Sequence, residues 1–537
     1  MSTTESCGFP RRDKRSFCFA HMCLCANTQL CLILDRNTTR MKKIKAIASA
    51  LLAGMMVLTL TACDETPAEN SGTPNSGAPG TTAPTTTPTQ TTFDTDPAVQ
   101  DAVKGLEVED PTLEVTDRIH WMAWWEIDET NAEAELFKEI YGVPEKGVQP
   151  ERNGKIFDYT YVAYGGRFDS LGTAIAADEG PDIFPFEIYD FPYGVLRGRY
   201  QPIDDIVNLD SPKFDGTRDL MEKFVLNGKH YCAFWQISMN NLFYYRKSVI
   251  GDLGVEDPRT LFEQGKWDWD AFLDMARKFQ QSGEGKYVID GFNPENDFVL
   301  STGTPMVANN DGVIVSNLRD PAVERVENQM LAVLQQENLR YPRHELNSYS
   351  VNPKMFADGD ILFYADGATW VWESTLSKYA KKFAWDDDEV QCVPCPKDPQ
   401  ADAHYVTLKQ DSLMWCKGSD NANGVSAWID CCATAAQSPD VKEAAIQQAI
   451  DKYNWNRELL EFIYSLTAVD GTSPVTPIVD FKGGLGTVSD SSATEAPVQS
   501  LTNLVYLTGE SYTALRETHE PAILAAIDDI NKAVSNG

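Results

Sequence analysis

Apolar and polar positions in the first half of the folded body follow two different periods. Apolar runs at 119–124 and 183–184, and an alternating run at 157–163, predict three strands. Apolar residues recur at helical spacing over 136–141 and 168–177, which predicts one helix between each pair of strands. The order strand, helix, strand, helix, strand predicts a right-handed, mostly parallel α/β sheet.

Local signals place further elements along the chain. Thr130 and Glu133 have the spacing of a capping box before the first helix, and Asp268 is an expected N-cap of a later amphipathic helix. A strand is expected at 361–364 and a last helix at 514–534. In parallel α/β sheets ligands bind outside the carboxyl ends of the strands, where this chain has loops rich in aromatic and acidic residues.

The segment 41–63 has the organisation of a secretory leader. A basic start at 41–45 is followed by a short apolar run and by Leu60-Thr61-Ala62-Cys63. This ending resembles the lipobox of bacterial lipoproteins. The resemblance implies that 41–62 is a lipoprotein signal peptide and that Cys63 carries fatty acyl chains that anchor the protein to the outer face of the cell membrane.

The segments on either side of this leader are expected to lie outside the folded body. Residues 1–40 do not fit a leader, and we expect translation to begin at Met41, so that they are an upstream extension. Residues 63–100 are dominated by Thr, Pro, Ser and Gly after the lipidated Cys63, and they are expected to form a disordered linker.

Composition narrows the classes of partner. The 537 residues are enough for two or three domains, and the formal net charge is −33 although the first 63 residues are basic. Such an acidic body repels polyphosphates, which excludes nucleic-acid binding. The acidity is typical of a solvated surface, and recruitment of a cationic ligand is the alternative.

Cysteine and histidine spacing indicates neither a metal nor another cofactor. In the expected mature body Cys392 and Cys395 form a C-x-x-C, but the only other close pair there is the adjacent Cys431 and Cys432, which suits tetrahedral zinc poorly. We expect packed thiols or an opportunistic disulfide, and no cofactor.

Several motifs in order resemble the extracellular solute-binding proteins of bacterial ABC importers, in the group that includes maltose-binding protein. Each motif alone is weak, and Arg246 stands where the family has Asn. The motifs are Gly180-Pro181-Asp182-Ile183, Asn227-Gly228-Lys229-His230-Tyr231, Tyr244-Tyr245-Arg246-Lys247, Asp268-Trp269-Asp270-Ala271-Phe272, and 356–363 with Gly367 and Trp370.

The resemblance implies an α/β, two-lobed periplasmic-binding-protein fold of type II, with strands that cross at a hinge and a ligand cleft between the lobes. It places lobe 1 at 101–242 and 410–450, and lobe 2 at 243–409 and 451–537. The crossings are expected near 241–245 and 408–413. Hinge closure would trap the ligand, and the closed monomer would deliver it to permease subunits in the membrane.

The resemblance also implies a carbohydrate ligand, a sugar or an oligosaccharide, and no catalysis. Phe186 and Trp370 match ring-bearing ligand positions of the family, while the other candidates come from loops at the expected cleft. The full set of ligand-binding candidates is Trp124, Trp125, Glu126, Phe186, Glu187, Tyr189, Asp190, Asn240, Asn241, Asp366, Trp370 and Trp372.

Three other functions stay open at this stage. An acidic cleft could bind a cationic peptide or a polyamine. A lipid-anchored glycoside hydrolase would need two carboxylates across a sugar subsite, which Glu126, Glu187 and Glu373 could supply. A binding protein of this kind could also serve a sensor instead of an importer.

Overall fold

The computed structural model describes residues 95–536, apart from 293, 311, 343–350, 469–470, 487–500 and 502–508. The expected leader, Cys63 and most of the expected linker lie outside the described residues. Helix α2 (Pro97–Val103), capped by Asp96, begins four residues inside the segment expected to be linker, and it packs on α3 and α17. The folded body therefore starts slightly earlier than predicted.

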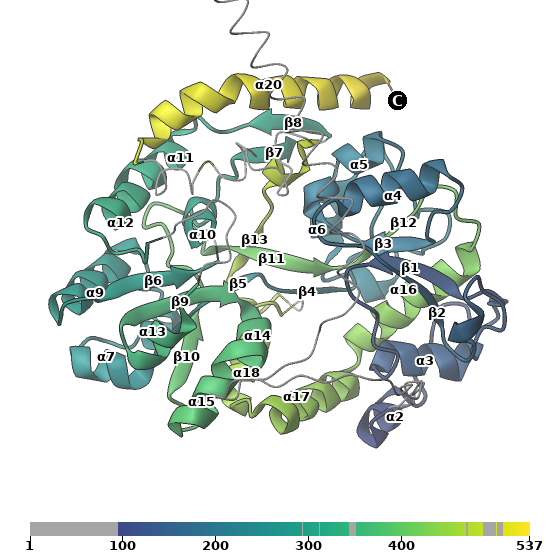
Figure 1. The fold of residues 1–537 in the computed structure, drawn as a ribbon, viewed down its shortest axis with the longest axis horizontal. Coiled ribbons are helices and arrows are strands. Elements are labelled where there is room, and N and C mark those ends of the chain that lie inside the picture. Colours follow the sequence, from purple (N-terminus) through teal and green to yellow (C-terminus); the bar gives the residue numbers. More distant parts are fainter. Residues whose placement is uncertain are drawn as a thin grey trace, which may run out of the picture. The chain divides into compact units, whose positions relative to one another are not determined.

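The first sheet has the strand order β12-β3-β1-β2 (Figure 1). Strands β1 (Ile119–Ala123), β2 (Phe157–Tyr161) and β3 (Ile183–Pro185) are parallel, as predicted, whereas β12 (Leu413–Trp415) is antiparallel to β3. We call the part of the chain built on this sheet lobe 1.

The helices α3 (Ala132–Tyr141) and α4 (Arg167–Ala176) connect the parallel strands of lobe 1, and α16 (Ala422–Gln437) packs against α3. The capping box expected before α3 is wrong by one position. Asn131 is the N-cap, because its side chain accepts a hydrogen bond from the Ala134 amide, whereas the Thr130 hydroxyl donates to Asp128 at 2.7 Å.

The second sheet, on which lobe 2 is built, has the order β10-β5-β9-β6. Strand β9 (Ile361–Gly367) lies parallel to β6 (Tyr287–Gly291) and antiparallel to β5 (Asn241–Arg246), and β10 (Val390–Val393) pairs with β5. Helix α9 (Trp269–Gln281) packs beside β6 and is capped by Asp268, which confirms that prediction.

A third sheet joins the lobes and has the order β13-β11-β4. Strand β4 (Gln236–Met239) leads directly into β5, and β11 (Tyr405–Asp411) leads back to β12, so both strands cross between the lobes. Strand β13 (Thr476–Ile478) pairs with β11. The first crossing therefore comes at β4, before the predicted 241–245, because that segment already belongs to the sheet of lobe 2.

A hairpin and the last helix complete the body. Strands β7 (Val307–Asn310) and β8 (Val313–Ser316) pair, and α20 (Tyr512–Asn536) lies along β8 and reaches α5 of lobe 1 (Figure 1). The Asn531 side chain exchanges two hydrogen bonds of 2.8 Å with the backbone of Ile314. The other helices are α5 (Tyr193–Leu196), α6 (Arg218–Met221), α7 (Lys247–Leu253), α8 (Pro258–Glu263), α10 (Pro294–Leu300), α11 (Pro321–Val326), α12 (Ala332–Gln336), α13 (Pro353–Asp358), α14 (Ala368–Val371), α15 (Ser377–Phe383), α17 (Pro439–Tyr453) and α18 (Arg457–Ser465).

The segment after β13 packs the Phe481 ring on Phe191 and Phe224 of lobe 1, and it comes close to lobe 1 through backbone at two glycines where a side chain would collide. A Cβ atom added at Gly484 would lie 1.7 Å from the Phe191 carbonyl oxygen, and one at Gly483 would lie 2.5 Å from the Tyr189 ring. We call this segment, residues 478–486, the glycine segment.

The described cysteines are packed thiols, the first of the two alternatives expected from the sequence. All six are buried and free, and burial raises the pKa of Cys232, Cys392 and Cys395. Within the described part of the chain, no group of His, Cys, Asp and Glu is arranged to hold a metal ion. No described helix combines the length and the apolar character that a membrane span needs.

Candidate functional site

A cavity of about 700 Å³ lies at the junction of the two lobes and the connecting sheet. Loops of lobe 1, the crossing strands, α10 of lobe 2 and the glycine segment each contribute walls. The lining residues are Tyr164, Phe186, Glu187, Ile188, Tyr189, Asn240, Asn241, Phe292, Asn296, Leu300, Thr407, Leu408, Lys409, Gln410, Ile478, Val479, Asp480, Lys482 and Gly483.

Five of the ligand residues expected from the sequence meet in this cavity. Phe186, Glu187 and Tyr189 reach it from the loop after β3, and Asn240 and Asn241 reach it where β4 passes into β5. Two segments distant in sequence thus line one cavity, at the carboxyl end of a parallel strand and at the crossing between lobes.

The aromatic loop after β1 adjoins the cavity without lining it. The Trp124 ring meets Tyr164, a lining residue, edge to face at 5.0 Å, and Trp125 follows at 4.6 Å from Trp124. Trp125 is 43% exposed. Glu126 forms an ion pair with Arg152 at 2.6 Å. These rings therefore continue the aromatic surface outward from the cavity.

The remaining candidates do not line the cavity. Asp190 is buried, pairs with Arg199 and accepts a hydrogen bond from the Tyr200 hydroxyl at 2.8 Å, and burial raises its pKa to about 6. Asp366 is buried at the end of β9, and Trp372 packs on Trp455 while its indole donates to the Tyr453 carbonyl. Trp370 is 52% exposed on α14.

The sequence analysis missed most of the polar lining. Thr407, Lys409 and Gln410 lie on β11, which was expected as a crossing strand but not as a source of ligand contacts. Asp480 and Lys482 belong to the glycine segment, which carried no recognised signal. Only the polar residues of β11, a strand expected to cross between the lobes, could have indicated its part in the site.

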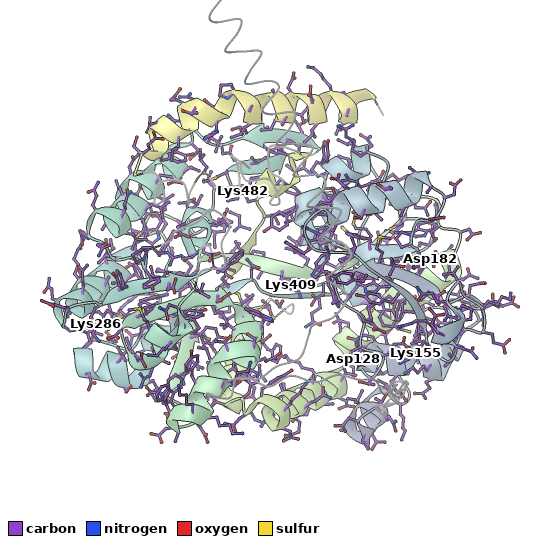
Figure 2. The ribbon with its side chains drawn as sticks, viewed as in Figure 1. Asp128, Lys155, Asp182, Lys286, Lys409 and Lys482 are labelled. Atoms are coloured by element: carbon purple, nitrogen blue, oxygen red, sulfur yellow. The ribbon has the colours of Figure 1, made fainter. Side chains whose placement is uncertain are left out.

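The charges at the cavity wall are balanced. Glu187 accepts from Arg167 at 2.7 Å, and burial raises the pKa of Glu187 while Arg167 opposes that rise. Lys482 lies 3.8 Å from Asp480, and Lys409, labelled with it in Figure 2, lies 3.2 Å from Asp411. A solute in this cavity therefore meets charges that already have partners, although the chain as a whole is strongly acidic.

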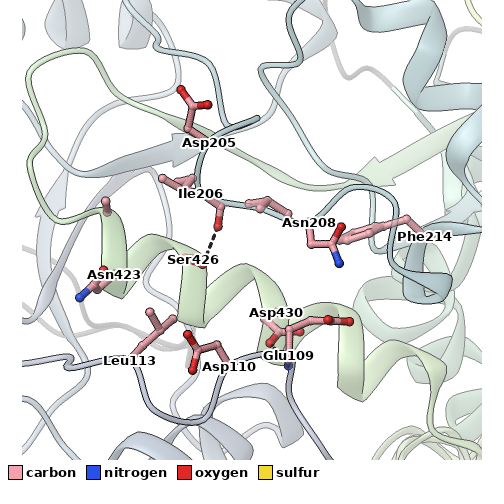
Figure 3. Close-up of a pocket in the computed structure, with 12 residues that line it drawn as sticks. Glu109, Asp110, Leu113, Asp205, Ile206, Asn208, Phe214, Asn423, Ser426 and Asp430 are labelled. Atoms are coloured by element: carbon pink, nitrogen blue, oxygen red, sulfur yellow. Dashed lines mark hydrogen bonds between the residues drawn. The ribbon is translucent and has the colours of Figure 1, made fainter.

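A smaller cavity of about 280 Å³ lies on lobe 1, between α16 and the loops that carry Glu109 and Asn208 (Figure 3). Lys213 bridges two of its acidic residues, at 2.6 Å from Asp430 and 3.8 Å from Glu109. None of the expected ligand residues lines it. We therefore take the larger cavity as the candidate site.

Comparison with known proteins bears on the family and the fold of the chain. The model of the family described as bacterial extracellular solute-binding protein matches residues 151–447, which is more than half of the chain. No curated protein sequence matches significantly.

Solved structures show the fold more fully. The galacto-N-biose/lacto-N-biose I-binding protein of the ABC transporter from Bifidobacterium longum, in complex with lacto-N-biose, matches with a TM-score of 0.54 and 12% identity over 78% of this chain and 98% of that one. The ABC substrate-binding protein Lmo0181 from Listeria monocytogenes, in complex with cycloalternan, matches with a TM-score of 0.50 and 16% identity over 78% of this chain and 99% of that one. The sugar-binding protein MalE from Xanthomonas citri matches with a TM-score of 0.50 and 15% identity over 78% of this chain and 98% of that one. These likenesses confirm the two-lobed binding-protein fold.

Proposed function

The chain belongs to the bacterial extracellular solute-binding proteins, and from this premise we propose that it captures a neutral sugar or oligosaccharide in the 700 Å³ cavity and delivers it to an ABC permease. Its family places it outside the cytoplasm. The proposal includes a lipid anchor on Cys63, supported by the sequence of 41–63 alone. Neutral carbohydrate is the solute class that the cavity wall favours most.

The observation that carries the proposal is the combination of rings with uncharged hydrogen-bonding groups. Tyr164, Phe186 and Phe292 offer faces for the apolar C–H side of a sugar ring, while amides and a hydroxyl can bind its rim of hydroxyl groups. The similar proteins from Bifidobacterium longum and Listeria monocytogenes hold lacto-N-biose and cycloalternan, which supports the same ligand class here.

The alternatives find less support at the cavity. A cationic peptide or polyamine would need free carboxylates, but Glu187 and Asp480 each have a basic neighbour. A hydrolase would need two carboxylates across the sugar. Of the three glutamates considered, only Glu187 lines the cavity, and Glu126 is paired with Arg152 outside it. The other lining carboxylate, Asp480, accepts hydrogen bonds from the backbone amides of Val307 and Lys482.

A thermal-shift screen of the body from residue 91 tests the proposal. We expect at least one of lacto-N-biose, cycloalternan, maltotriose and a wider set of neutral saccharides to raise Tm, because a ligand that binds only the folded state stabilises it. At about 100 times Kd the gain is about 3 kcal/mol. Spermidine and basic peptides serve as the comparison, and a shift with these alone would contradict the proposal.

A cavity-filling pair of variants assigns the site to one cavity. Asn240→Trp places an indole in the larger cavity at an exposed position, so we expect the saccharide-induced Tm shift to disappear while the Tm of the free protein stays nearly the same. Asn423→Trp, which fills the smaller cavity, is the matched control and should keep the shift. The opposite pattern would move the site to lobe 1.

A further inference from the structure

Two buried charged side chains form hydrogen bonds with the polar lining of the cavity: Asp297 lies behind the lining, whereas Lys482 belongs to it. Asp297 on α10 is 5% exposed, and Lys482 in the glycine segment is 8% exposed. Each forms hydrogen bonds with side chains that line the cavity. They therefore control which hydrogen-bonding atoms are left for a solute.

Asp297 leaves acceptors at the cavity. The Asn241 Nδ2 group donates to Asp297 Oδ2 at 2.9 Å and to the Phe292 carbonyl at 3.2 Å. Both partners only accept, so this amide has one possible orientation, and its Oδ1 has no partner among the described residues. The Thr407 hydroxyl donates to Asp297 Oδ1 at 2.9 Å, so the lone pairs of the Thr407 oxygen stay available to accept a hydrogen bond from a solute.

Lys482 has the opposite effect on Asn296, the residue that precedes Asp297 on α10. Its Nζ donates to Asn296 Oδ1, so the Asn296 carbonyl is occupied and its Nδ2 group, without a partner among the described residues, remains a donor. The ammonium group is held near the Asp480 carboxylate at 3.8 Å. The cavity thus offers acceptors at Asn241 and Thr407 and donors at Asn296.

We infer that Asp297 and Lys482 are positioning residues that set the hydrogen-bond polarity of the cavity, so that it selects a neutral polyhydroxy solute with two hydroxyl donors for Asn241 and Thr407 and an acceptor for Asn296. This inference rests on the proposed function and specifies it. A hydroxyl group both donates and accepts, so neighbouring sugar hydroxyls meet this pattern. Burial raises the pKa of Asp297 to about 6, and above that pH its carboxylate can only accept.

A ligand-free measurement tests the orientation itself. Hydrogen exchange of the side-chain amides, followed by NMR on the body labelled with ¹⁵N-asparagine, should be at least about tenfold slower for Asn241 than for Asn296, because only the former donates into the interior. Asn241→Ser and Asn296→Ser identify the two signals by their loss. Equal rates, or the reverse order, would overturn the inference whether or not any saccharide binds.

A binding measurement tests the selectivity. The probes are lacto-N-biose, maltotriose or the strongest binder of the screen, each compared with its monodeoxyfluoro analogues, in which fluorine cannot donate. For the wild type, fluorine at one or two positions of the sugar should raise Kd about tenfold, which is the loss of affinity expected for one hydrogen bond. In Asp297→Asn the new amide has both a donor and an acceptor, so either the bond from Asn241 or the bond from Thr407 must reverse its direction. The loss of affinity caused by fluorine should then shrink to about threefold or less.

Controls separate this effect from general weakening. Thr407→Val removes one acceptor and leaves Asp297, so it should reduce the same fluorine penalty. Asp398→Asn changes a buried carboxylate paired with Arg325 outside the cavity and should leave the penalties as in wild type. Saccharide binding with the same penalties in wild type and Asp297→Asn would overturn the inference and keep the proposed function. No saccharide binding together with the expected exchange rates would reject the proposed function alone.

Discussion

Replacing Glu327 by glutamine is expected to stabilise the protein at pH 8.5 by on the order of 4 kcal/mol and to change little near pH 4.5. Glu327 is 2% exposed, and neither carboxylate oxygen has a hydrogen-bond partner among the described residues. Burial is the main cause that raises its pKa to about 8, with a smaller contribution from Glu295, while Lys482 opposes the shift. The fold therefore favours the protonated acid.

The sign follows from the two pKa values of this group. Its folded pKa lies above its ordinary value of 4.5, so its contribution to stability is complete below about pH 4.5 and is lost as pH rises toward 8. Glutamine does not ionise, so the variant lacks this loss. Urea unfolding of both proteins between pH 4.5 and 8.5 measures the difference. The exposed Glu139→Gln is the control, and a difference for Glu327→Gln that does not grow with pH would contradict the prediction.

Replacing Arg340 by methionine is expected to destabilise the protein by about 3–5 kcal/mol, because it leaves buried carboxylates without their shared cation. Arg340 donates to Asp290 Oδ1 and to Glu295 Oε1, both at 2.8 Å. The two acids are 0% and 1% exposed. Glu295 lies on α10 between Pro294 and Asn296, so this cluster also ties the cavity helix to β6.

Arg277→Met is the matched control for this charge loss. Arg277 pairs with Glu337 at 3.0 Å, but both side chains are more than one third exposed, so the expected cost is about 1 kcal/mol or less. Denaturant unfolding of both variants gives the comparison. In Arg340→Met, the further changes Asp290→Asn and Glu295→Gln should recover part of the stability. Equal costs for Arg340→Met and Arg277→Met would show that the buried cluster is not a net source of stability.

The strands and helices of lobe 1 could be predicted because their apolar residues repeat with the period of each element. The loop at 186–190 could be predicted as part of the site because parallel α/β sheets bind ligands at the carboxyl ends of strands. Which residues of that loop face the cavity could not be predicted from the sequence. Tyr189 and Asp190 are consecutive in a 3-10 turn, where neighbouring side chains diverge by about 120°, so one lines the cavity and the other meets Arg199.

The same geometry explains Trp370 and Trp372. Residues two apart in a helix point about 200° apart, so both rings cannot face one cleft. Trp370 is exposed and Trp372 is buried against Trp455. The glycine segment could not be predicted for a different reason. At Gly483 and Gly484 it meets lobe 1 through backbone where side chains are absent, and a contact of this kind leaves no periodic pattern of apolar residues.

The pairing of distant strands has a consequence for synthesis of the chain. Strand β3 of the first sheet pairs with β12, which lies more than 220 residues later in the sequence. Ile314 forms hydrogen bonds with Asn531 in the last helix. A ribosome releases the amino-terminal part first, so the sheet of lobe 1 cannot be completed before β12 has emerged, and the hairpin at 307–316 cannot bind its last helix until nearly the whole polypeptide has emerged. Pairings of such long sequence separation form slowly, and unpaired strand edges are open to aggregation meanwhile. The nascent chain therefore depends on protection until its final helix is available.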